Sequence, residues 1–119
     1  MKYMLLIYMD EQAMNDTERE NCYVESAGFA HQLHENGQYL AASPLQPVST
    51  ATSVRVRDGR RLVTDGPFAE TREQLGGYFL VDAKNLDEAI GIAGRIPGAR
   101  VGTVEIRPVI EVPNLPKSV

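Results

Sequence analysis

The hydrophobic and polar positions along the chain predict a mixture of strands and helices. Residues 4–9 and 78–81 are continuous apolar runs too short for helices. They predict strands buried on both faces over residues 4–9 and 76–81. Residues 38–45 predict another strand. Residues 104–112 predict the last one, and Pro108 within it indicates an edge strand or a bulge, because proline has no amide hydrogen to donate.

Residues 16–36 have the periodicity of an amphipathic helix. Asp16 or Thr17 is expected to cap its start. Gly37 is expected to close its end, because glycine readily adopts the conformation that terminates helices. One helical stripe is expected to be buried, flanked by Tyr23 and Ala27; it consists of Cys22, Ser26, Phe29, Ala30, Leu33 and Gly37. Cys22 in this stripe is expected to be an inert core thiol.

Residues 86–95 predict a second helix. Asn85 is the expected N-cap, and Glu88, three residues further on, is its expected partner in a capping box. Pro97 and Gly98 stop the helix. The expected buried face consists of Leu86, Ala89, Ile90 and Ala93.

The dipeptide Asp58-Gly59 separates two strand-like runs, residues 53–57 and 60–64. This pattern predicts a β-hairpin, because a type I′ turn requires positive φ at both central positions. Arg57 and Arg60 then face each other across the hairpin, and such a like-charge pair costs stability.

The order of elements predicts an α+β fold of the ferredoxin-like β-α-β-β-α-β type with an inserted hairpin. One domain is expected over residues 1–112, with a C-terminal tail over 113–119. Both helices of such a fold cover one face of the sheet. Because the strands at 4–9 and 78–81 are apolar on both faces, the other face is expected to pack against a second copy, giving a homodimer.

The composition excludes several classes of partner and site. The chain has 119 residues and a net charge of −4, which disfavours nucleic acid. One cysteine excludes an internal disulfide, and with two histidines three residues apart it provides no zinc spacing, so no metal or other cofactor is expected. The N-terminal apolar run stops at Asp10, too short for a membrane span or a secretion signal, and a cytoplasmic protein is expected.

Residues 65–77, DGPFAETREQLGG, are unusually rich in turn formers and ionisable groups. With its flanks this loop resembles the signature of the DGPF proteins of the YCII-related family. Four further segments are similar to the same family: MKYMLLIY at 1–8, ATSVR at 51–55, LDEA at 86–89 and RIP at 95–97.

The resemblance implies a dimeric ferredoxin-like α/β barrel. Some family members are thought to be enzymes that use a His–Asp pair, including a dehydrochlorinase acting on a muconate-type ring-cleavage product. DGPF members are often encoded beside extracytoplasmic-function sigma factors, which suggests a role near stress signalling. The enzymes' histidine lies on the first helix, where this chain has His31 and His34. DGPF relatives usually carry other polar residues there, so the resemblance assigns the histidine to neither position.

Asp65 and His34 are the candidate catalytic residues. Asp65 follows a strand and could act as a general base or orient a histidine. The alternative is an Asx-turn, in which its carboxylate binds its own backbone ahead of Gly66 and Pro67. A His34–Asp65 dyad would suit proton abstraction from a small acid. The alternative for His34 is a half-buried structural histidine beside the apolar stripe.

The candidate ligand-binding residues are Phe68, Glu70, Glu73, Tyr78, Arg55 and Arg57. Glu70 and Glu73 share a face if the loop forms a helical turn; they then make either an acidic cluster with Asp65 or a solvated surface. Tyr78 would line the cavity or pack in the dimer core. The arginines would bind a small acidic ligand or partner, or else discourage aggregation at the hairpin.

Two functions fit these residues. The first is a small-ligand-binding or signalling-associated module that uses the cavity or the arginine-rich hairpin. The second is a cofactor-free enzyme performing proton-transfer chemistry, such as elimination or isomerisation, on a small organic acid. The relative positions of Asp65, His34 and Tyr78 are expected to discriminate between them.

Overall fold

The computed structural model describes residues 1–117, so residues 118–119 of the expected tail lie outside the described part. Four strands form one antiparallel sheet in the order β2-β5-β1-β6. Their bounds are β1 Lys2–Met9, β2 Tyr39–Pro44, β5 Gln74–Asp82 and β6 Thr103–Pro108. The last strand is an edge strand, as its proline predicts, but it ends at Pro108 and does not continue to residue 112.

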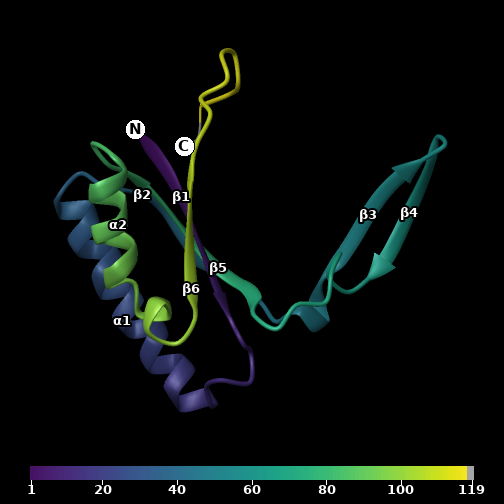
Figure 1. The fold of residues 1–119 in the computed structure, drawn as a ribbon, viewed down its shortest axis with the longest axis horizontal. Helices are drawn as coiled ribbons and strands as arrows, with labels where there is room; N and C mark the ends of the chain where they lie inside the picture. Colours follow the sequence, from purple (N-terminus) through teal and green to yellow (C-terminus); the bar gives the residue numbers. More distant parts are fainter. Residues whose placement is uncertain (118–119) are drawn as a thin grey trace.

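Two helices, α1 (Asp16–Glu35) and α2 (Leu86–Arg95), cover the same face of the sheet (Figure 1). The largest fully buried side chains include Leu5 of β1, Leu33 of α1 and Ile92 of α2. This core joins the inward residues of the two central strands to the apolar stripes of both helices. None of the helices within residues 1–117 is long and apolar enough to cross a membrane.

The predicted buried face of α2 is wrong by part of a turn. Leu86 and Ile90 are both 51% exposed, whereas Ile92 is 1% exposed. The inward stripe runs through Ala89, Ile92, Ala93 and Ile96. This spacing of three and four residues turns Ile90 towards solvent.

The helix caps differ from the sequence prediction in detail. Asn15, rather than Asp16 or Thr17, caps α1, and its Oδ1 accepts a 2.8 Å bond from the Glu18 amide. The Glu18 side chain in turn accepts a bond from the Asn15 amide, which completes a capping box. Asn85 caps α2 as predicted. The predicted capping box does not form, because the Glu88 side chain does not bind the Asn85 amide. Glu88 Oε1 instead accepts a 2.9 Å bond from Gln38 Nε2 and a 3.2 Å bond from the Lys84 amide. Glu88 therefore ties the start of α2 to the segment before β2.

The predicted hairpin is confirmed and forms a sheet of its own. Strands β3 (Thr52–Arg57) and β4 (Arg60–Asp65) pair around Asp58 and Gly59, whose φ angles are 52° and 73°. We call residues 52–65 the arm. Figure 1 shows the arm standing clear of the four-stranded sheet, on the side away from the helices.

The face of the sheet opposite the helices is apolar, and no helix within residues 1–117 covers it. Met4 pairs with Leu80 and Leu6 pairs with Tyr78 across β1 and β5. All four alternate with core residues, so their side chains share the outer face and are only half-buried. We call this surface the bare face. Its covering by a second copy stays a prediction.

One exposed ion pair joins α1 to the short 3₁₀ helix η2 (Pro97–Arg100). The Arg100 guanidinium donates to both carboxylate oxygens of Glu25, at 2.7 and 2.8 Å. Hydrogen bonds from Arg100 lower the pKa of Glu25 from its ordinary value of 4.5.

Replacing Glu25 by glutamine is expected to flatten the acid side of the stability profile. Arg100 lowers the pKa of the Glu25 carboxyl in the folded state. The ion pair therefore stabilises the fold above a pH of about 4.5, and this stabilisation is lost as the pH falls through the lowered pKa. Urea midpoints should therefore be lower for Glu25→Gln than for the wild type near neutrality, and the two should converge once the pH falls below the lowered pKa of Glu25. The difference should be small because the pair is exposed. Glu35→Gln, on the same helix, serves as control; a gap that persists at low pH would contradict this role for the pair.

Candidate functional site

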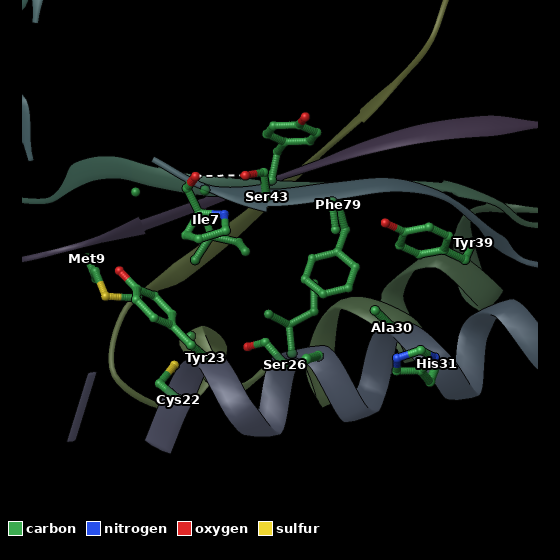
Figure 2. A pocket seen from close by; sticks show the side chains of 18 of the residues that line it. Ile7, Met9, Cys22, Tyr23, Ser26, Ala30, His31, Tyr39, Ser43 and Phe79 are labelled. Atoms are coloured by element: carbon green, nitrogen blue, oxygen red, sulfur yellow. Dashed lines mark hydrogen bonds between the residues drawn. The ribbon is translucent and has the colours of Figure 1, made fainter. Parts of the chain in front are cut away.

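A partly open pocket lies between α1 and the strands β2 and β5, and its volume is about 480 Å³. Figure 2 shows side chains of α1, among them Ser26 and Ala30, facing the sheet residues Ile7 and Phe79 across this space. A pocket of this size suits a small molecule.

The pocket exists because α1 presents small side chains towards the sheet along part of its length. Phe29 and Leu33 fill the core, with 7% and 0% exposure. Ser26, Ala27 and Ala30 lie beside them at helical spacing and leave room unfilled. The predicted buried stripe is thus half core and half pocket wall. Cys22 is likewise half-buried and lines the pocket, so its prediction as a core thiol is wrong.

Gly77 lets β2 approach β5 at the pocket's upper wall. A Cβ at this position would lie 3.0 Å from the Ser43 carbonyl oxygen and 3.2 Å from Pro44 Cα. Both are backbone atoms that cannot rotate away. The glycine therefore fixes the spacing of the wall formed by Ser43, Pro44 and Gly77.

Polar groups gather at the two ends of the pocket. Tyr23 and Ser26 lie towards one end, and His31 and Tyr39 line the other (Figure 2). His34 also lines the pocket, beside Tyr39. The His34 and Tyr39 rings meet edge to face, with centroids 6.3 Å apart. The residues that line the pocket include no Asp, Glu, Lys or Arg. Histidine is therefore the lining residue type suited to gaining or losing a proton near neutrality.

The structure does not bring Asp65 to this pocket within one chain. Asp65 ends β4, pairs with Thr52 in the arm and is exposed. Its carboxylate makes no hydrogen bond within residues 1–117, so it forms no Asx-turn either. The turn is held by Gly66, whose φ is 103° and whose amide donates to the Ala51 carbonyl at 2.7 Å. Ser53 Oγ donates to the Gly66 carbonyl at 2.8 Å.

The other predicted loop residues are also dispersed. Residues 66–73 contain no helical turn, so Glu70 and Glu73 do not share a helical face. Glu73 accepts a 2.9 Å bond from Thr103 Oγ1 and so ties the loop to β6. Phe68 is 82% exposed. Within the described chain there is no cluster of three or more His, Cys, Asp or Glu that could hold a metal ion.

Tyr78 and the arm arginines lie outside the pocket's polar ends. Tyr78 is one of the lining residues, but it alternates with Phe79, so its side chain points to the bare face. This fits the alternative of packing in a dimer core. Arg55 and Arg57 lie on the arm, and Arg57 faces Arg60 as predicted.

Sequence reasoning missed three of the polar lining residues. The helical pattern predicts packing roles for Tyr23 and Ser26, and Tyr39 is predicted only as part of a strand. The sequence does contain a signal for the pocket, which is the run of small residues on α1 next to two histidines. Where the side chains of a buried stripe are too small to fill the space against the sheet, a cavity remains.

Comparisons with known proteins agree on the family and the fold. The chain matches the family model described as the YCII-related domain over residues 1–113. It is 35% identical over 114 residues to an uncharacterised protein of Rhizobium meliloti (strain 1021), covering 92% of each chain.

A solved structure has a similar fold at low sequence identity. It is the 5-chloro-2-hydroxyhydroquinone dehydrochlorinase of Burkholderia phenoliruptrix AC1100 in complex with 2,5-dihydroxybenzoquinone. The TM-score is 0.57 at 10% identity, and the match covers 94% of this chain and 96% of the other. At this identity the likeness concerns the fold alone.

Proposed function

Because this chain belongs to the YCII-related family, we propose that the pocket between α1 and the sheet binds a small, flat, largely apolar molecule bearing a hydroxyl or carbonyl group. The main support for this proposal is the pocket itself, which has a volume of about 480 Å³, apolar walls and uncharged polar groups at its ends. On this proposal the protein is a ligand-binding module, serving as a carrier or in signalling.

The apolar walls of the pocket favour a ring compound as the ligand. Ile7, Ala30, Ala42 and Phe79 offer contact surface but no hydrogen bonds from their side chains. His34 and Tyr39 offer both a donor and an acceptor at one end.

The fold neighbour suggests a probe. Its structure contains 2,5-dihydroxybenzoquinone, a planar ring with hydroxyl and carbonyl groups. Calorimetric titration of this compound into the protein should give saturable binding, one molecule per chain, with a dissociation constant below about 1 mM. Absence of saturable binding at about 5 mM would contradict the proposal for this class of ligand.

A second candidate function is cofactor-free proton-transfer catalysis in the same pocket. The observation that favours it is the pair of imidazoles, His31 and His34, at the end of a pocket with no fixed charge. His34 would take the proton as general base. Asp65 lies outside the pocket of its own chain, so it would orient the imidazole only if a second copy supplies it.

The enzyme candidate is tested by chloride release from 5-chloro-2-hydroxyhydroquinone, the compound in the neighbour's name. In such an elimination the base takes a proton, the C–Cl bond breaks and chloride leaves. His34→Gln should reduce the rate about 100-fold or more, and His31→Gln should reduce it less. Equal rates for the wild type and His34→Gln would exclude His34 as the base.

We propose further that the bare face is covered by a second copy, giving a ferredoxin-like dimeric α/β barrel. The support is the apolar surface of Met4, Leu6, Tyr78 and Leu80 at the centre of the sheet. The single cysteine is compatible with the cytoplasmic compartment that the sequence suggests. Sedimentation of the purified protein tests the dimer directly.

A further inference from the structure

The arm is not explained by the fold of a single chain. The radius of gyration is 16.0 Å, whereas a compact domain of this length has about 13.5 Å. The arm and the segment after β6 both extend away from the sheet (Figure 1), and within residues 1–117 the arm pairs only with itself. An isolated two-stranded hairpin is at best marginally stable in water. Something else must therefore pack on it.

One face of the arm is apolar. Val54 pairs with Val63 and Val56 pairs with Arg61, so these four side chains share a face. The three valines are 60%, 59% and 62% exposed, in the order Val54, Val63 and Val56. Arg55, Arg57 and Arg60 lie on the opposite face. The arm thus presents three valines and one arginine to whatever covers it.

Helix α1 has the complementary charge. It contains five carboxylates and one arginine, whereas the arm contains four arginines and two aspartates. Glu20 is exposed, and it continues the stripe of Tyr23, Ala27 and His31 at spacings of three and four residues. The first part of this stripe therefore offers the contact surface of Tyr23 and Ala27 beside the carboxylate of Glu20, which complements the valines and Arg61.

The arm cannot reach α1 of its own chain, because the sheet lies between them (Figure 1). A second copy on the bare face would change this. Facing sheets lie about 10 Å apart, and the partner's helices form the next layer beyond its sheet. Six-residue strands, such as those of the arm, extend about 20 Å. The arm is thus long enough to pass the partner's sheet and reach its helix layer.

We propose that the arm of each copy lies across helix α1 of the other copy, at the mouth of the partner's pocket, with the valines on Tyr23 and Ala27 and Arg61 facing Glu20. This inference rests on the proposed sheet-to-sheet homodimer but not on the identity of the ligand. The pocket is then closed by the partner, and ligand exchange is coupled to assembly.

A charge swap tests the docking. Dimer dissociation constants are measured by sedimentation equilibrium for the wild type, Arg61→Glu, Glu20→Arg and the double variant. Each single change should raise the constant about tenfold or more, because like charges would then face each other. The double variant should return to within about threefold of the wild type. Arg60→Glu, on the opposite face of the arm, is the matched control and should change the constant less than about threefold.

Hydrogen exchange provides an independent readout in the unmodified protein. Amides of residues 54–63 should be protected at concentrations above the dissociation constant and should lose protection on dilution below it. A wild-type protein that stays monomeric would overturn the arm proposal together with the dimer. A dimer with an unprotected arm, or with no rescue in the double variant, would overturn the arm proposal alone. Binding of 2,5-dihydroxybenzoquinone is measured separately, so its failure is distinguishable from both.

Discussion

Gly102→Ala is expected to destabilise the fold by about 3 kcal/mol or more. Gly102 lies between η2 and β6, where the chain passes against the end of β1. A Cβ there would overlap the Tyr8 carbonyl oxygen and would lie 2.9 Å from Met9 Cβ and 3.0 Å from Met9 Cα. These atoms belong to a central strand of the sheet, so no rotamer change relieves the clash.

Gly91→Ala is the matched control. Gly91 lies in α2, and a Cβ there would meet no atom within 4 Å. Because alanine is the better helix former, this change should stabilise the protein by up to about 1 kcal/mol. Urea denaturation of both variants measures the difference. A loss below about 1 kcal/mol for Gly102→Ala would mean that the loop does not approach β1 this closely.

Ala30→Phe is expected to block the pocket and to reduce the affinity for 2,5-dihydroxybenzoquinone about 100-fold or more. Ala30 faces Phe79 and Ile7 across the pocket (Figure 2), so a phenyl ring would occupy the space proposed for the ligand. The fold should survive, because the added ring enters an existing hollow rather than a filled core. Isothermal titration calorimetry measures the loss.

Val24→Phe is the control for this substitution. Val24 is 72% exposed on the same helix and does not line the pocket, so it adds the same ring without blocking the site. Its affinity should equal that of the wild type. Equal affinities in Ala30→Phe and Val24→Phe would show that the probe binds elsewhere.

Local features were predictable because short-range physics determines them. The turn at Asp58 and Gly59 follows from the positive φ that a two-residue hairpin requires, and both residues adopt it. The cap of α2 at Asn85 follows from its side-chain oxygen. The two central strands follow from their continuous apolar runs.

The site was less predictable because it depends on how distant segments meet. A His34–Asp65 pair is compatible with the sequence, but the position of Asp65 depends on the direction of the arm, which no local pattern encodes. The arm directs Asp65 away from the pocket of its own chain. The pocket exists because the side chains of Ser26, Ala27 and Ala30 are small. A hydrophobicity pattern does not distinguish small apolar residues from large ones, so it does not indicate the pocket.

A crystal structure with 2,5-dihydroxybenzoquinone bound would show whether the space between α1 and the sheet is a ligand site. The ring should contact Ala30 and Phe79, with an oxygen within hydrogen-bond distance of His34 or the Tyr39 hydroxyl. A ring bound only outside this space, or a pocket filled by the chain's own side chains, would contradict the proposed ligand site.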